Sequence, residues 1–84
     1  MTNKEILKKQ IIYRSNHRGI KEMDLLLGSF VKKYIEDFNE IELNDLINLL
    51  LIDDDVLHKW YFNKISNSII PNNKVSILLR NYKI

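Results

Sequence analysis

Apolar residues recur every three or four positions along most of the chain, which is the spacing of one face of an α-helix. The longest such pattern predicts a helix over about residues 19–38. Gly28 lies inside this stretch and costs up to about 1 kcal/mol relative to alanine, but the apolar stripe on both sides is strong enough to continue the helix. The residues expected on its inner face are Ile20, Met23, Leu27, Phe30, Val31, Tyr34, Ile35 and Phe38.

Four shorter segments show the same periodicity. They predict helices over about residues 3–16, 42–52, 55–64 and 74–82. The clearest loop spans residues 67–73 and contains the one proline of the chain, Pro71. Because two glycines and one proline leave few turns for a sheet, the sequence predicts an all-α fold, a compact five-helix bundle that forms a single domain over residues 1–84.

The stripes of the shorter helices predict which side chains meet in the core. In the first helix the inner residues are Ile6, Leu7 and Ile11. In the third helix they are Leu43, Leu46, Ile47, Leu50 and Leu51. We expect one shared core, with these residues in or near it: Leu27, Phe30, Leu46, Leu50, Trp60 and Leu79.

Composition narrows the classes of function. The chain has 13 basic and 11 acidic residues, so its net charge of +2 does not by itself indicate nucleic-acid binding. It has no cysteine, which excludes disulfides and thiolate metal sites. The longest apolar run is too short to span a bilayer, and the charged start of the chain differs from a secretory signal. We therefore expect a cytoplasmic protein that begins at Met1 and does not insert into a membrane.

The sequence contains no recognisable catalytic, metal or cofactor motif. His17 and His58 have no cysteine to activate, and no serine lies in a G-x-S-x-G turn. There is no glycine-rich phosphate loop. Asp53, Asp54 and Asp55 lack the alternate spacing and closing glutamate of a calcium loop, and helix capping is their expected role. We expect no catalytic residue, no bound metal and no cofactor bound by this chain.

One segment, residues 13–24 between the first two helices, is unusually dense in polar groups: Tyr-Arg-Ser-Asn-His-Arg-Gly-Ile-Lys-Glu-Met-Asp. Helix capping is one interpretation. In it Gly19 adopts a positive φ that ends the first helix, while the basic residues face the negative end of that helix and the acidic residues face the positive start of the next. The charged residues involved are Arg14, His17, Arg18, Glu22 and Asp24.

A docking patch is the other interpretation of this segment, because one cap needs one or two charges and five are present. Arginine is a frequent interface anchor, and glycine allows a partner backbone to approach closely. Glu22 follows Arg18 by four residues, so we expect both on the same side. Docking predicts that alanine at either position leaves the melting temperature nearly unchanged, whereas capping predicts a loss of roughly 0.5–2 kcal/mol.

The same segment carries a family resemblance. Arg18-Gly19-Ile20-Lys21-Glu22 resembles the R-G-x-x-E motif of the succinate dehydrogenase assembly factor 2 family, which includes the bacterial SdhE-like flavinylation factors. The similarity continues through residues 23–30, like the family's E-x-D-x-x-L segment, and again from Leu49 to Trp60. Together these segments cover about half of the chain, in the order and spacing of the family.

The resemblance implies an assembly factor and not an enzyme. Such a protein binds the flavoprotein subunit of succinate dehydrogenase, and in some bacteria that of fumarate reductase, and promotes covalent attachment of FAD to a histidine of that subunit. FAD is then attached to the partner. With the position of the turn, the resemblance implies a partner-binding surface made of Arg14, Arg18, Gly19, Glu22 and Asp24.

A different class of function stays open at this point. A small helical nucleic-acid-binding or antitoxin-like module has a similar length, and the pairs Lys8-Lys9 and Lys32-Lys33 are basic. The interspersed acidic residues and the small net charge weigh against this alternative.

Overall fold

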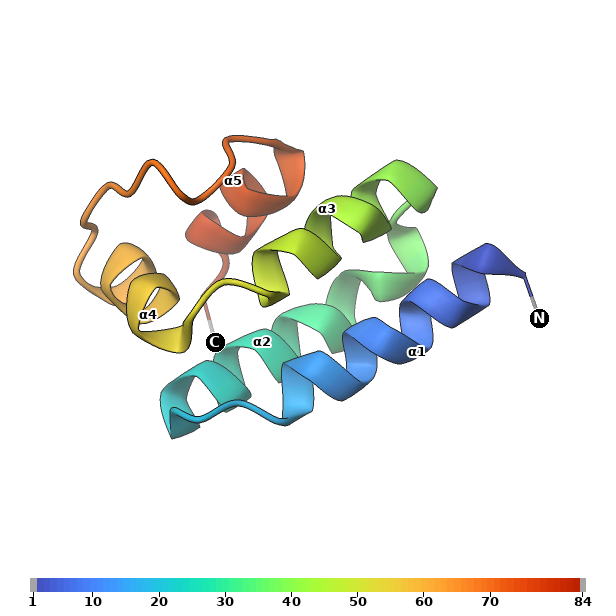
Figure 1. Cartoon of the computed structure of the whole chain (residues 1–84), viewed down its shortest axis with the longest axis horizontal. Coiled ribbons are helices and arrows are strands. Elements are labelled where there is room, and N and C mark those ends of the chain that lie inside the picture. Colours follow the sequence, from blue (N-terminus) through green and yellow to red (C-terminus); the bar gives the residue numbers. More distant parts are fainter. Residues whose placement is uncertain (1, 84) are drawn as a thin grey trace.

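Five α-helices form the computed structural model of the chain, which describes residues 2–83 (Figure 1). A single 3₁₀ turn, η1, continues the second helix. There is no strand among the described residues, so the predicted all-α five-helix fold is confirmed. The elements are α1 (Asn3–Asn16), α2 (Lys21–Tyr34), η1 (Ile35–Asp37), α3 (Glu40–Leu50), α4 (Asp54–Phe62) and α5 (Lys74–Asn81).

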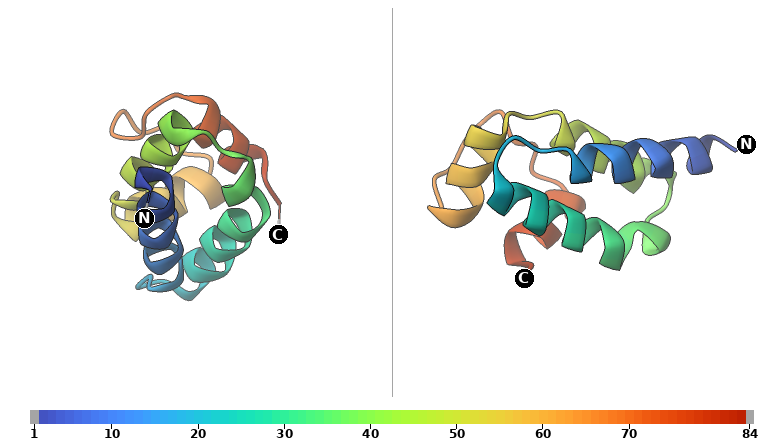
Figure 2. Two further views of the ribbon diagram at one scale, coloured as in Figure 1. Left: turned by 90° about the vertical axis from the view of Figure 1, so that its right-hand side faces the viewer. Right: turned by 90° about the horizontal axis from the view of Figure 1, so that it is seen from below.

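The helices pack around α1 and α2, which run antiparallel and are joined by a short corner at one end of the molecule (Figures 1 and 2). α1 contacts both α2 and α3, α5 packs on α3, and α4 packs on α2. The turn between α3 and α4 therefore lies beside the corner between α1 and α2, although the two are more than thirty residues apart in sequence (Figure 1). This arrangement creates the site described below.

Most helix ends after α1 differ from the prediction by one to four residues, and local capping explains the earlier start of α3. The long helix predicted over residues 19–38 ends at Tyr34 and is followed by η1. α3 then begins at Glu40, two residues earlier than predicted, because Asn39 forms a capping box. The Asn39 side chain accepts from the Glu42 N–H at 2.8 Å, and the Glu42 carboxylate accepts from the Asn39 N–H at 2.9 Å.

The predicted core is confirmed for all six of its named residues, each at most 5% exposed. Two inner-face predictions were wrong: Ile6 is 41% exposed and Leu51 is 58% exposed. Because α3 ends at Leu50, Leu51 lies in the following turn and points outward, while Leu49 is buried in its place. The N-terminal end of α1, the helix that contains Ile6, extends beyond the other helices (Figure 2).

The end of the chain is fixed against the core through Tyr82, which follows the last residue of α5. Its hydroxyl is hydrogen-bonded to Ser29, and its carbonyl accepts a hydrogen bond from the Tyr61 hydroxyl. The Tyr82 ring stands edge-on to Phe30 with 5.5 Å between the ring centroids. These contacts tie the C-terminal segment to α2 and α4.

Glu42 gives the fold a predictable acid dependence. Its carboxylate accepts a hydrogen bond from Lys74 at 2.8 Å in addition to that from Asn39, and the two contacts lower its pKa below the ordinary value of 4.5. A carboxyl with a lowered pKa stabilises the fold above its unfolded pKa, and this contribution is lost as the pH falls through its folded pKa. Glu42→Gln should therefore lose less stability than the unchanged chain below about pH 4.5.

This pH effect can be checked by denaturant unfolding at pH 7 and at a series of lower pH values. Glu40→Gln is the matched control, because Glu40 is exposed on the same helix and its carboxylate makes no ion pair with another described residue. We expect the free energy of unfolding to fall less with decreasing pH for Glu42→Gln than for the control. An equal fall for the two variants would show that these contacts of Glu42 do not contribute to the acid dependence of stability.

Candidate functional site

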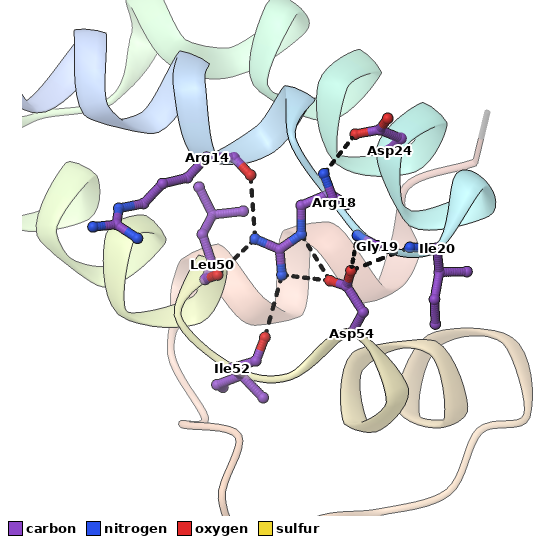
Figure 3. Close-up of polar contacts among 8 residues, drawn as sticks. All are labelled: Arg14, Arg18, Gly19, Ile20, Asp24, Leu50, Ile52 and Asp54. Atoms are coloured by element: carbon purple, nitrogen blue, oxygen red, sulfur yellow. Dashed lines mark hydrogen bonds and ion pairs between the residues drawn. The ribbon is translucent and has the colours of Figure 1, made fainter.

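The polar corner between α1 and α2 is organised around the Arg18 side chain, which points into the protein and is only 8% exposed (Figure 3). Its Nε and one terminal nitrogen lie 2.7 and 2.6 Å from Oδ1 of Asp54, the first residue of α4. The guanidinium also donates to the carbonyl of Leu50 at 2.7 Å and to that of Ile52 at 3.2 Å. Arginine suits this place because its planar fork can serve several acceptors at once.

Arg18 also closes the C-terminal end of α1. Its guanidinium donates to the carbonyl of Arg14 at 3.2 Å, while His17 Nδ1 lies 2.7 Å from the carbonyl of Tyr13. The carbonyl of Leu50 is at the end of α3, so one cation serves the negative ends of two helices. The capping interpretation is therefore confirmed for Arg18 and His17.

The Asp54 carboxylate holds the backbone of the corner with its second oxygen. Oδ2 accepts from the Gly19 N–H at 2.7 Å and lies 3.4 Å from the Ile20 nitrogen (Figure 3). On the other side of the corner, Asp24 accepts from the Arg18 N–H at 3.1 Å. The corner is thus fixed by two carboxylates, one from α2 and one from α4.

The role predicted for Gly19 in ending the helix was wrong. No described glycine has a positive φ, so the corner does not need glycine for its backbone conformation. A Cβ placed at Gly19 would lie 3.6 Å from Asp54 Oδ2, which is an ordinary contact distance. Gly19 is nevertheless exposed, so its missing side chain leaves the backbone accessible from outside.

Among the residues predicted for partner binding, the charged side chains of Arg14 and Glu22 have no partner among the described residues. Both are exposed, and Arg14 points away from the Arg18 network (Figure 3). The expectation that Arg18 and Glu22 share one side is wrong, because the Arg18 side chain is buried and that of Glu22 is exposed. The five residues predicted for partner binding therefore separate into an inner pair, Arg18 and Asp24, and an outer set, Arg14, Gly19 and Glu22.

Exposed apolar groups lie next to the outer set. Tyr13 is 63% exposed and stacks on His17 with 4.0 Å between the ring centroids. Leu51 is 58% exposed and lines a shallow hollow together with Arg14 and His17. A surface that combines a flat aromatic pair, a leucine and unpaired charges is suited to contact with another protein. We call the exposed residues Tyr13, Arg14, His17, Gly19, Glu22 and Leu51 the corner surface.

Sequence reasoning missed the role of Asp54. Asp53, Asp54 and Asp55 were expected to cap the helix that they begin, but Asp53, the N-cap of α4, makes no side-chain cap hydrogen bond. Asp54 instead binds the corner before α2, which spacing along the chain cannot reveal. The one available signal was that acidic residues gather at the start of α4 and basic residues gather at the end of α1.

The described residues contain neither a cluster of metal-binding side chains nor a membrane-spanning helix. In that part of the chain no three histidine, aspartate or glutamate side chains come together in a way that could hold a metal ion. None of its helices is both long enough and apolar enough to cross a membrane.

Comparison with known proteins identifies relatives along most of the chain. Residues 9–83 match the family described as flavinator of succinate dehydrogenase. A FAD assembly factor SdhE from Acetobacter pasteurianus is 33% identical over 73 residues, which are 87% of this chain and 64% of the relative. A mitochondrial succinate dehydrogenase assembly factor 2 from Scheffersomyces stipitis is 45% identical over 56 residues, 67% of this chain and 38% of the relative.

A further relative, the mitochondrial succinate dehydrogenase assembly factor 2 of Saccharomyces cerevisiae, is 38% identical over 73 residues, 84% of this chain and 45% of the relative. The chain thus spans between 38% and 64% of the length of these three curated relatives. No solved structure matches it significantly. The match over residues 9–83 includes the whole corner surface, and this chain belongs to the flavinator of succinate dehydrogenase family.

Proposed function

We propose that this chain is an assembly factor that docks onto the flavoprotein subunit of succinate dehydrogenase and promotes covalent attachment of FAD to it. The observation that carries the proposal is the family match over residues 9–83, within which the R-G-x-x-E motif forms a braced corner with an exposed outer side. Arg14, Gly19 and Glu22 would meet the partner. Arg18 and Asp24 would take part by holding these residues in place.

The chain would act by positioning and not by its own chemistry. In the reaction that the family resemblance implies, a histidine nitrogen of the flavoprotein bonds to the 8α-methyl carbon of its flavin. The imidazole N–H and the methyl group each lose a proton, and the flavin ring takes up the two electrons, so all reacting groups belong to the partner. Aligning two such groups can lower a barrier by several kcal/mol without any catalytic side chain from the assembly factor. A rigid corner is suited to this task, because a docking surface that is already ordered loses little entropy on binding.

Three finer points belong to the same proposal. The flavoprotein of fumarate reductase is a second candidate partner, as the family resemblance implies for some bacteria. We place the chain in the cytoplasm, which cell fractionation would test. The nucleic-acid-binding alternative is set aside, because the relatives are named for FAD assembly and for succinate dehydrogenase assembly. A heparin column at moderate salt would retain the chain if that alternative were right.

The proposed function can be tested by co-expression. The flavoprotein subunit would be produced with and without this chain, and covalent flavin would be measured by fluorescence of the denatured subunit in a gel. We expect the flavin signal to depend on co-expression and the two proteins to co-purify. A fully flavinylated subunit in the absence of any assembly factor, with no co-purification, would contradict the proposal.

We further expect the purified chain to carry neither flavin nor a bound metal ion, because FAD in this proposal is attached to the partner. The measurement is an absorbance spectrum in the region where oxidised flavin absorbs, together with elemental analysis of the purified protein. Stoichiometric flavin on the isolated chain, or transfer of FAD by this chain to an unrelated acceptor, would contradict the proposal that the reacting groups belong to the partner.

A further inference from the structure

We infer that Asp54 is a positioning residue of the corner surface: its carboxylate, which comes from the start of α4, sets the backbone path of Gly19 and Ile20 and thereby the placement of Gly19 and Glu22 for docking. The inference rests on the proposed function for the identity of the partner. It adds a residue outside the R-G-x-x-E motif to the determinants of docking.

The first support is that α2 lacks a cap of its own. α1, α3 and α5 each begin with a side-chain cap, from Thr2, Asn39 and Asn73. α2 begins after Ile20, which has no polar side chain and makes no cap hydrogen bond. Asp54, 34 and 35 positions away in sequence, instead binds the backbone just before the helix, where its Oδ2 accepts from the Ile20 and Gly19 N–H groups. The residues that lead into α2 are thus held by α4 and not by a cap within α2.

The second support is that the two oxygens of Asp54 serve different groups. Oδ1 lies between Nε and a terminal nitrogen of Arg18, at 2.7 and 2.6 Å, while Oδ2 faces the backbone (Figure 3). Arg18 is itself held by the carbonyls of Leu50 and Ile52. The guanidinium therefore fixes the orientation of the carboxylate, and the carboxylate fixes the corner.

The third support comes from Gly19. Since its φ is not positive and a Cβ there would meet only an ordinary contact, glycine at this position does not determine the local conformation. In our inference the hydrogen bond from the Gly19 N–H to Asp54, at 2.7 Å, holds the backbone there. The missing side chain of Gly19 then leaves room for a partner to approach closely.

Asp54→Asn is the most informative variant, because it keeps the size of the side chain and removes one acceptor. The remaining oxygen is expected to stay on the guanidinium, since hydrogen bonds to a charged donor are the stronger ones. The NH2 group then faces the N–H groups of Gly19 and Ile20, which lose their acceptor. Asp55→Asn is the matched control, because Asp55 is an exposed aspartate of the same helical turn with no partner among the described residues.

The experiment combines amide hydrogen exchange of the isolated chain with its affinity for the flavoprotein subunit, both well below the melting temperature. For Asp54→Asn we expect exchange at Gly19 and Ile20 to accelerate roughly tenfold more than at core amides such as that of Leu27, whose exchange reports only the loss of global stability. We expect the affinity to fall by roughly the same factor. Asp55→Asn should match the unchanged chain in both measurements.

The outcomes are separable. Unchanged exchange at Gly19 and Ile20 in Asp54→Asn would overturn the inference, because the carboxylate would then not hold the corner. Faster exchange with full affinity would also overturn it, because docking would not depend on the corner's conformation. If the unchanged chain does not bind the flavoprotein at all, the proposed function is wrong, while the exchange rates still decide whether Asp54 sets the corner.

Discussion

Arg18→Ala is expected to lower the free energy of unfolding by about 3–5 kcal/mol, because it leaves a buried carboxylate without its cation. The side chains of Arg18 and Asp54 are only 8% and 15% exposed, so water cannot replace the lost partner easily. The carbonyls of Leu50 and Ile52 lose a donor in the same step. For a domain of this length the total stability is of order 5–15 kcal/mol, so the variant is expected to be close to unfolding.

This result would differ from what the docking interpretation predicts from sequence, an unchanged melting temperature. Thermal unfolding followed by circular dichroism measures it, at roughly 4–8 °C per kcal/mol for a chain of this size. Arg14→Ala is the matched control, because Arg14 is exposed and its guanidinium has no partner among the described residues. Similar melting temperatures for the Arg18 and Arg14 variants would show that the buried ion pair does not stabilise the fold.

Glu22→Ala is expected to leave the chain folded but unable to dock onto the flavoprotein, in contrast to the loss of stability expected for Arg18→Ala. Truncating one partner of a desolvated charge pair at an interface typically costs about 2–5 kcal/mol of binding free energy. In the free chain Glu22 is exposed and contributes only its favourable place in the first turn of α2, about 0.3–1 kcal/mol. We therefore expect loss of covalent flavin on a co-expressed partner with little change in melting temperature.

Glu40→Ala is the control for this second prediction, because Glu40 is also an exposed glutamate in the first turn of a helix, α3. It should show the same small loss of stability and full flavinylation. Full flavinylation with Glu22→Ala would remove Glu22 from the proposed surface and leave the fold untouched. Loss of flavin with both variants would indicate an effect of charge in general.

The helices and most of the core could be predicted because they depend on short-range periodicity. α1 has the predicted bounds, and all six named core residues are buried. The early start of α3 was also readable, since Asn39 and Glu42 have the spacing of a capping box. The exposure of Leu51 has another cause, since α3 ends at Leu50 and leaves Leu51 in the following turn.

The candidate site could be located from the sequence but not resolved into its parts. Five charged groups in one corner indicated a role beyond capping, and the structure divides the five residues predicted for partner binding into inner and outer ones. That division depends on the contact between Arg18 and Asp54, which are 36 positions apart. Periodicity assigns faces to helices but does not determine which helix ends meet, so this contact was not predictable from spacing.

Site-specific photo-crosslinking tests the docking surface most directly. A photoreactive phenylalanine analogue would replace Lys21, which is exposed beside Glu22, or Ile41, which is 73% exposed at the start of α3 (Figure 1). α2 and α3 begin at opposite ends of the molecule, so the two probes report on different surfaces (Figure 1). We predict that the probe at position 21 forms a covalent adduct with the flavoprotein subunit and that the probe at position 41 does not. An adduct from position 41 with none from position 21 would contradict docking through the corner between α1 and α2.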